Sequence, residues 1–385
     1  MRRSLALGVV LALGLGGCSL IAPDPAPTPV ETFDISGDGV LRIGTLFGLT
    51  GADAATGAAQ VAGVELAVRD INLAGGVNGS RVEVFHRNSA DDASGDPAGV
   101  ASVSLDALLE RGADVIIGPS SAAVATALLP AAGDVPLISA SAQVATAGLF
   151  SVAPTDAGES RALAAALDGA KTVAVVHPEG TDGPTLKKPV DITFTAGTPD
   201  AGAVARDAEG ADAVVLSGAV ADVAVLVPAL LESGIAPDRL WFARDSAGSY
   251  ATLLPAGALT GAHAIVGGAN PAAEFAAALR QTDPGLGSVR FAAEAYDATV
   301  LAALSAVVAG DDGGPAIARG LRAVSSEGIP CTGFGQCVDT LASRDDVDYD
   351  GVSGRVGITE SGGVGSGSWG LLEYGATNIP VAVAD

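Results

Sequence analysis

Two adjacent serines, Ser120 and Ser121, are the residues best placed for binding chemistry in this sequence. They follow a short apolar run at 114–118, which predicts a buried strand, and they open a helical pattern at 121–132. At such a turn, free backbone N–H groups and serine hydroxyls face outward, and a helix N-terminus favours a carboxylate. Serine also caps helices, and the two roles are compatible. The sequence therefore predicts that this turn contacts a small ligand.

Patterns for catalysis or metal binding are weak. The sequence contains no GxSxG, no HExxH and no Gly-rich phosphate loop with Lys, and it has only three His. Asp346, Asp348 and Asp350 resemble the start of a calcium loop, but position twelve, which needs a bidentate Glu, is Gly357. We therefore expect no enzyme activity, no cofactor and no metal site.

Composition argues against a nucleic-acid partner. The 385-residue chain has 44 acidic and 20 basic residues, and its net charge of −24 repels phosphate backbones. Aromatic residues make up 4% of the chain, too few for a base-stacking surface, whereas 49% hydrophobic residues can form a large core.

The N-terminus has the pattern of an export signal. Arg2 and Arg3 precede an apolar run at 5–15, which is too short to span a bilayer but fits a signal h-region. The run ends in LGGC at 15–18, which resembles the lipobox of bacterial lipoproteins, where the Cys becomes the diacylated first residue. The alternative is an ordinary signal peptide with an incidental Cys. The sequence thus predicts a signal at 1–17 and a lipid anchor at Cys18.

The segment at 18–39 is expected to be a tether, because it is rich in Pro and lacks apolar periodicity. Two further cysteines, Cys331 and Cys337, remain after the lipidated one. Disulfides persist outside the cytoplasm, and no CxxC redox motif is present, so these two are predicted to pair. Closing so short a loop stabilises the fold by roughly 2–2.5 kcal/mol.

The elements that position these residues alternate between strand and helix. Strands are predicted at 41–47, 81–86, 114–118, 137–139, 172–177, 191–195, 213–217, 240–243, 262–267, 354–358 and 370–374. Helices are predicted after the first strand, where residues 61, 64, 68 and 71 form an apolar stripe at helical spacing, and at 97–110, 121–132, 220–233, 271–282, 291–309 and 315–324. This alternation predicts parallel sheets covered on both faces. The length after Gly39 suits two α/β lobes, and ligands in such folds bind beyond the carboxyl ends of the strands.

Several turns and helix ends carry short, recognisable sequence motifs in a fixed order. These are GLTG at 48–51, ELAVRDIN at 65–72, AGGVNG at 74–79, IGPSS at 117–121, VPLISASA at 135–142, ADAVVL at 211–216, AYDA at 295–298 and YDGVSG at 349–354. In this order they resemble the leucine/isoleucine/valine-binding type of periplasmic binding protein, over about residues 40–374.

The resemblance implies a type I periplasmic binding protein fold, with two doubly wound lobes, three crossings between them and a ligand cleft. The first lobe is expected at 40–153 and 270–352, and the second at 154–269 and 353–385. The resemblance also implies that the lobes close over the ligand and that the protein delivers it to an ABC permease in the membrane.

Carrying the family's site over places Ser120, Ser121, Ser141 and Ala142 at the cleft, where the last two would clamp the carboxylate and ammonium groups of a ligand. Gln143 stands where the family usually has Thr, and the alternative is an ordinary Ser-rich loop. Asp245 would face the ligand ammonium. Its alternatives are a pair with Arg244 or a helix cap with Ser246.

Two departures put the second lobe's part of the site in question. Thr56 stands where family members often have Tyr, and 177–184 lacks the usual Asp-rich turn with Tyr-Gly. About 14 residues, crowded with Pro, separate His177 from the next predicted strand. We therefore expect the usual full helix to be missing there, with a changed ligand class or loss of binding as the consequence.

The sequence thus indicates a lipid-anchored solute-binding protein on the outer face of a bacterial membrane, for a small amino acid or amide-like solute. Two alternatives stay open: a sensory or regulatory binding module on the same fold, and a degenerate lipoprotein without a small ligand.

Overall fold

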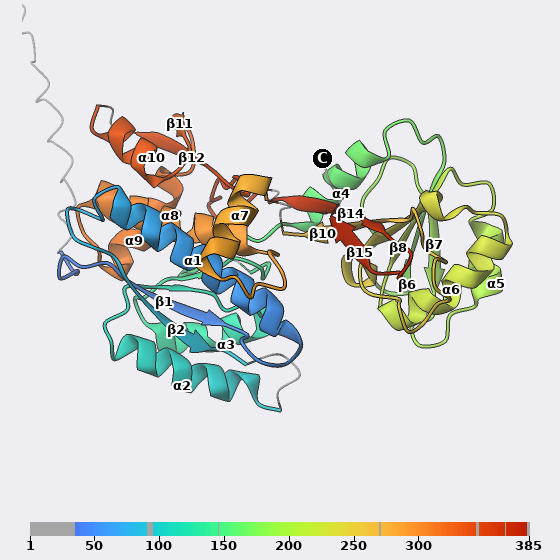
Figure 1. Ribbon diagram of the computed structural model, residues 1–385, viewed down its shortest axis with the longest axis horizontal. Helices are drawn as coiled ribbons and strands as arrows, with labels where there is room; N and C mark the ends of the chain where they lie inside the picture. The colour runs from blue at the N-terminus through green and yellow to red at the C-terminus, as the bar shows by residue number, and fades with distance from the viewer. Residues whose placement is uncertain are drawn as a thin grey trace, which may run out of the picture. The chain divides into compact units, whose positions relative to one another are not determined.

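The computed structural model describes residues 35–90, 95–144, 146–268, 271–343, 346–365 and 367–382. Figure 1 shows the arrangement of helices and strands. The predicted signal at 1–17, the lipid-anchor residue Cys18 and most of the predicted tether at 18–39 lie outside the described residues.

The first lobe is built on a parallel sheet with the strand order β2-β1-β3-β4-β5. Its strands are β1 (Arg42–Phe47), β2 (Glu83–Asn88), β3 (Val115–Ile117), β4 (Leu137–Ser139) and β5 (Leu149–Ser151). The helices between them are α1 (Ala54–Leu73), α2 (Pro97–Leu109) and α3 (Ala122–Ala132). β3 and β4 are fully buried, as their apolar runs predict, although β2 begins two residues later than expected.

The chain returns to this lobe for its second half. The returning elements are α7 (Ala273–Thr282), α8 (Ala292–Ala309), α9 (Gly314–Ala323), β11 (Ile329–Cys331), α10 (Phe334–Leu341), β12 (Val347–Gly351) and β13 (Gly354–Arg355). α8 packs against α1 and α9 on one sheet face, and α2 and α3 cover the other (Figure 1). β11, β12 and β13 form a small separate sheet. The strand expected at 354–358 is therefore wrong beyond Arg355, because β13 ends there.

α1 and the start of α8 approach closely at a glycine. A Cβ on Gly63 would lie 2.1 Å from the carbonyl oxygen of Ala292, so only glycine allows this contact. α8 is the one described helix that is long and apolar enough to cross a membrane, and 83% of it is buried within the lobe. Its apolar character is therefore that of a core helix.

The second lobe has a mixed sheet with the order β15-β14-β10-β9-β8-β6-β7, in which β14 and β15 are antiparallel to their neighbours. Its strands are β6 (Val173–Pro178), β7 (Val190–Phe194), β8 (Ala213–Ser217), β9 (Leu240–Ala243), β10 (His263–Gly267), β14 (Trp369–Tyr374) and β15 (Pro380–Ala382). Its helices are α4 (Asp156–Ala166), α5 (Ala201–Asp207) and α6 (Val220–Glu232). α5 and α6 cover one face, and α4 packs on the other.

The helix that we expected to be missing is indeed missing. β6 pairs in parallel with β7, yet the connection at 179–189 consists of turns and irregular backbone. A Cβ on Gly183 would lie 2.6 Å from Cγ1 of Val175 and 2.9 Å from Cδ2 of His177, so the connection lies directly on β6. The connection at 179–189 thus takes the place of a helix on this face.

The chain crosses between the lobes after β5, after β10 and after β13, which confirms the three predicted crossings. The exact residue boundaries of the lobes stay a prediction. β13 pairs with β12 and so belongs to the first lobe's small sheet, although it lies beyond residue 352.

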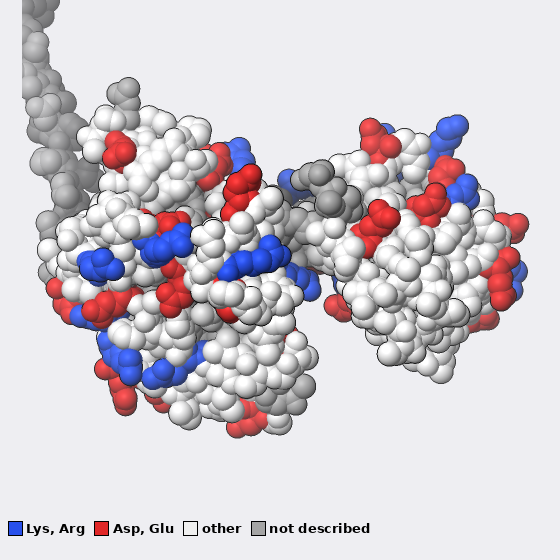
Figure 2. All heavy atoms as spheres, in the orientation of Figure 1, with Lys and Arg blue, Asp and Glu red and all other residues white. Residues whose placement is uncertain are grey.

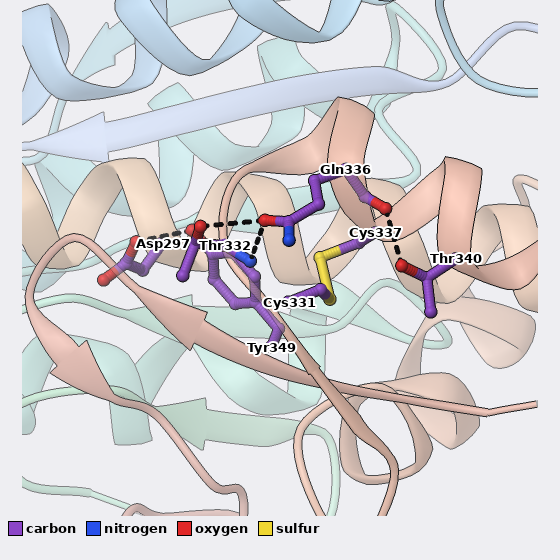
Figure 3. The surroundings of a disulfide bond; sticks show 7 residues. All are labelled: Asp297, Cys331, Thr332, Gln336, Cys337, Thr340 and Tyr349. Atoms are coloured by element: carbon purple, nitrogen blue, oxygen red, sulfur yellow. Dashed lines mark hydrogen bonds between the residues drawn. A yellow bond between two sulfur atoms is a disulfide. The ribbon is translucent and has the colours of Figure 1, made fainter.

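Cys331 and Cys337 form the predicted disulfide, which joins the end of β11 to α10 (Figure 3). Both cysteines are buried. Gln336 adds a second link, because its Oε1 accepts hydrogen bonds from the backbone N–H and the hydroxyl of Thr332 at 2.8 and 2.9 Å. The short β11–α10 connection is therefore held by covalent and polar links together.

On the face shown in Figure 2, Lys and Arg side chains are scattered among Asp and Glu and do not gather into one basic field.

Candidate functional site

The start of α1, the loops after β3 and β4, and the residues just before α8 line a cavity of about 270 Å³, which we call the serine chamber. It is lined by Asp53, Thr56, Gly57, Gln60, Ser120, Ser121, Ser141, Arg290 and Phe291. Three of the predicted site residues, Ser120, Ser121 and Ser141, are thus brought together. They lie at the carboxyl ends of parallel strands, where α/β folds bind ligands.

A second cavity of about 330 Å³, the hinge chamber, shares Ser141, Arg290 and Phe291 with the first. Its remaining lining residues are Gln143, Pro154, Asp156, Arg244, Asp245, Ile265, Val266, Gly267 and Trp369. Residues of both lobes therefore line it, and it contains the predicted residues Gln143 and Asp245.

Gln60 organises the serine chamber. It is fully buried on α1, its Oε1 accepts the Ser120 hydroxyl at 2.8 Å, and its Nε2 donates to the Ser141 hydroxyl at 3.1 Å. The amide thus joins two loops that are far apart in sequence. We missed Gln60 from the sequence, although Val61, Val64, Val68 and Ile71 form an apolar stripe at helical spacing, and a polar residue four positions before Val64 on it was a usable signal.

Ser121 is the N-cap of α3, and its Oγ accepts the Val124 N–H at 3.4 Å. The capping role that the sequence allowed is therefore real. It still leaves the hydroxyl proton free, and Ser121 also lines the chamber. The two roles coexist, as expected.

Ala142 is not brought to either chamber. Its backbone N–H donates to the Ser139 hydroxyl at 3.0 Å, and its carbonyl accepts the Ser151 hydroxyl at 2.7 Å. Both backbone groups are therefore used inside the lobe. The neighbouring Gln143 does line the hinge chamber, where its Nε2 donates to Asp156 at 3.2 Å.

Asp245 is exposed in the hinge chamber, on a short 3-10 turn at Arg244–Ser246. Neither alternative role that we left open is seen among the described contacts. The Ser246 hydroxyl bonds to backbone groups of β8 and β9, at Leu216 and Ala243. Arg244 pairs with other carboxylates, so Asp245 faces the chamber.

Arg244 connects α4, β9 and the connection at 179–189. Its Nε lies 2.9 Å from Oε2 of Glu159, which is fully buried, and its Nη1 donates to the Asp182 carbonyl at 2.9 Å. Asp156 adds a longer contact at 3.5 Å. Burial raises the pKa of Glu159, and the Arg244 guanidinium opposes that shift.

Arg290 and Phe291 line both chambers and were missed from the sequence. The Nε of Arg290 donates to the Gly267 carbonyl at 2.9 Å, and its guanidinium lies 4.8 Å from the centre of the Phe291 ring. Phe291 has a left-handed backbone with φ 59°, and so has Arg244 with φ 53°. Such strain in bulky residues is often found at functional sites. Helical periodicity locates α8 but does not show what precedes it.

The chambers offer hydroxyls, backbone N–H groups, carboxylates and guanidinium groups. Among the described residues, no group of three or more His, Cys, Asp or Glu is arranged to hold a metal ion. In the discounted calcium motif, Asp348 and Asp350 both face Arg355, at 3.0 and 3.5 Å. The arrangement suits reversible binding of a small polar molecule.

A family model described as periplasmic binding protein matches residues 40–345. The chain belongs to this family. The match confirms the resemblance predicted from the sequence and, with the two-lobe architecture, the predicted type I fold. A comparison of this periplasmic binding protein with curated sequences gave no match.

Solved structures share the fold at low identity. The branched-chain amino acid transporter substrate-binding protein LivJ from Streptococcus pneumoniae, in complex with isoleucine, is 22% identical, with a TM-score of 0.58 over 89% of this chain and 100% of that one. A putative branched-chain amino acid ABC transporter protein from Silicibacter pomeroyi is 16% identical, with a TM-score of 0.62 over 90% and 96%. A solute-binding protein from R. palustris, in complex with 4-hydroxybenzoate, is 16% identical, with a TM-score of 0.55 over 89% and 96%.

Proposed function

We propose that this periplasmic binding protein captures a small amino acid or amide-like solute outside the cytoplasm and delivers it to an ABC permease. The observation that carries the proposal is the pair of adjoining chambers, which combine hydroxyls of the first lobe with charged groups of the second. Related folds are described with isoleucine and with 4-hydroxybenzoate bound, so both compounds are reasonable first probes. Closure of the lobes would couple ligand occupancy to permease docking.

In this proposal Ser120, Ser121 and Ser141 contact one end of the ligand, and Asp245 contacts its ammonium or amide end. Gln143 borders the same space but is partly engaged with Asp156. The connection at 179–189 lacks the expected helix, yet the hinge chamber still receives Arg244 and Asp245 from the second lobe.

A thermal-shift screen tests the proposal. The chain starting after Cys18 would be screened against free amino acids, short amides, urea and 4-hydroxybenzoate. A ligand at 100 times its Kd adds about 2.7 kcal/mol of stability, which gives a clear shift. Asp245→Ala should lose the shift, whereas Asp238→Ala, an exposed aspartate on another 3-10 turn, should keep it. A folded protein with no shift for any compound would overturn the proposal and favour a degenerate lipoprotein without a small ligand.

We further propose that Cys18 anchors the protein to the outer face of the membrane. The support is the LGGC motif at 15–18, with which the apolar run at 5–15 ends. Two acyl chains give stable attachment, where one is marginal. Cys18→Ser expressed in a bacterium with lipoprotein processing should move the protein from the membrane fraction to the soluble fraction. An unchanged distribution would contradict the anchor.

A further inference from the structure

The connection at 179–189 borders a further cavity, which we call the lysine pocket. Parallel neighbours such as β6 and β7 are usually joined through a helix, but here turns and irregular backbone join them. The cavity measures about 410 Å³ and lies between the C-terminal end of α4 and the last residues of the connection. It therefore occupies the face from which the helix is missing.

The positive charge of this pocket is unusual for so acidic a chain. Lys171, Lys187 and Lys188 are the only lysines among the 385 residues, and all three line the pocket. Each is exposed, and none has an ion pair or a hydrogen bond from its ammonium group among the residues that the structure describes. Like charges around one cavity repel one another, and a bound anion removes that repulsion.

Two acidic residues lie near the lysines. Asp168 lines the pocket, so the lining has three positive groups against one negative group. Asp212 is close to Lys171 and acts on its charge, but its Oδ2 accepts the backbone N–H groups of Lys171 and Thr172 at 2.9 and 3.0 Å. The pocket itself therefore keeps an excess of two positive charges.

The lysine pocket is separate from the two chambers. Lys171 and Lys188 precede β6 and β7, so they lie at the amino ends of these parallel strands. The hinge chamber receives Asp245 and Gly267 from the opposite, carboxyl ends of β9 and β10. The pocket shares no lining residue with either chamber. A molecule bound there is thus distinct from the solute of the proposed function.

We propose that the lysine pocket is a second binding site, for a small organic anion that carries two negative charges on an apolar body. The ammonium groups supply the matching charge. Leu167, Val173 and Leu186 line the pocket and pack partly buried against the apolar cluster beneath it, so they offer an apolar wall. Phosphate monoesters and dicarboxylates of apolar compounds have this chemistry. The inference does not depend on the proposed function.

Calorimetry on the full chain at low salt tests the site with one probe and its two halves. The probe is phenyl phosphate, which is a dianion near pH 7.5. Inorganic phosphate keeps the charge without the ring, and phenol keeps the ring without the charge. Phenyl phosphate should bind at least about 5-fold more tightly than phosphate, because the apolar wall covers part of the ring, and at least about 10-fold more tightly than phenol.

Variants of the lysines show where the probe binds. Lys171→Gln/Lys187→Gln/Lys188→Gln should weaken phenyl phosphate by about 10- to 100-fold, since each exposed ion pair accounts for about a 2- to 5-fold change in affinity. Replacement of the same three residues by Arg keeps the charge and should leave the affinity within about 3-fold.

The matched control is Arg81→Gln/Arg206→Gln/Arg280→Gln. It removes the same total charge from exposed positions that line neither the lysine pocket nor the chambers, and it should leave the affinity within about 3-fold. An equal loss in this control would mean that only long-range charge attracts the probe, and it would overturn the site.

Two further results would overturn the site: no binding of phenyl phosphate by the wild type, and unchanged binding in the Lys→Gln triple variant. If that variant does not fold, NMR of the wild type decides. Shifts at the backbone amides of 167–173 and 186–188 support the site, and shifts confined to chamber residues overturn it. The proposed function is tested separately, because a solute of the chambers should bind the triple variant with unchanged affinity.

Discussion

The two lobes of this protein cover their sheets differently. In the first lobe, α1 and α8 bury a large apolar core on one face, and α2 and α3 bury a second core on the other. In the second lobe, α5 and α6 bury a comparable core, but the opposite face has only α4 and the connection at 179–189 over a small cluster. On this thinner face, Arg244 pairs with Glu159 and donates a hydrogen bond to the Asp182 carbonyl. These polar contacts stand where other sheet faces of the protein have apolar packing.

The same contrast extends to the site. The first lobe supplies hydroxyls that a buried amide, Gln60, holds in place, together with Asp53 and the guanidinium of Arg290. The second lobe supplies charged groups on the 3-10 turn at Arg244–Ser246, and one of them, Arg244, also supports the fold. In the first lobe, Gln60 thus fixes the orientation of the hydroxyls in the site. In the second lobe, Arg244 both lines the site and stabilises the fold.

The largest effect is expected from the ionic link of the second lobe. Arg244→Met leaves the fully buried Glu159 unpaired and should lower the free energy of unfolding by about 3–5 kcal/mol, measured by urea denaturation. The double variant Arg244→Met/Glu159→Met should recover most of that loss, because two apolar groups tolerate burial. A loss below about 1 kcal/mol for the single variant would mean that this pair does not hold the thinner face.

A carboxyl in the first lobe should give the clearest pH effect. Burial raises the pKa of Asp114 to about 7, with Asp312 adding repulsion. Because the folded state then binds the proton more tightly than the unfolded state, the stabilisation is present below pH 4 and is lost as pH rises to 7. Asp114→Asn removes this titration and can still accept the Arg42 N–H. The stability difference between variant and wild type should change by about 1–3 kcal/mol between pH 4 and 8, less than the full equivalent of the pKa shift because Asp114 is partly exposed and screened by solvent.

The measurement is urea denaturation of both proteins at each pH. The sign of the change is the decisive part. If the variant's advantage did not grow as the pH rises, burial of Asp114 would not be the cause.

A smaller effect is expected for the disulfide of the first lobe. Cys331→Ser/Cys337→Ser should lower stability by about 2 kcal/mol, since the closed loop is short. Reduction of the wild type should give the same decrease in a thermal melt. Ligand affinity should stay unchanged, because neither cysteine lines a chamber. A changed affinity would show that this region of the first lobe is coupled to the site.

The smallest effect tests how closely the connection at 179–189 lies on the sheet. Gly183→Ala places a methyl group against Val175 and His177 and should cost about 1–2 kcal/mol in thermal or urea denaturation. Gly375→Ala is the matched control in the same lobe, because a Cβ there has no atom within 4 Å. Equal stability of the two variants would mean that the connection does not pack on β6.

Much of the fold could be predicted from the sequence because local signals agree with the tertiary structure. The apolar runs at 114–118 and 137–139 became buried strands, and the Pro-crowded gap after His177 has no helix. Short or weakly periodic elements were not found, among them β5, β11 and β15, since three residues carry little pattern. The strand expected at 354–358 failed because the chain leaves the small sheet after β13.

The residues of the candidate site were also predicted only in part. The loops after β3 and β4, which hold Ser120, Ser121 and Ser141, were found because parallel strands end at a common edge. Gln60 was not found because the pattern of α1 indicates only packing, and Arg290 and Phe291 were not found because they precede α8 in a segment without periodicity.

The sequence alone therefore determined the family, the alternation of strands and helices, the pairing of the two cysteines and the missing helix, because these depend on local order and composition. Only the tertiary structure decided which polar groups meet. In the structure, Gln60 hydrogen-bonds to both Ser120 and Ser141, and the backbone of Ala142 bonds inside the first lobe. Arg290 lines the same cavity as the serines. These side-chain contacts join residues far apart in the chain, so a local sequence pattern does not predict them.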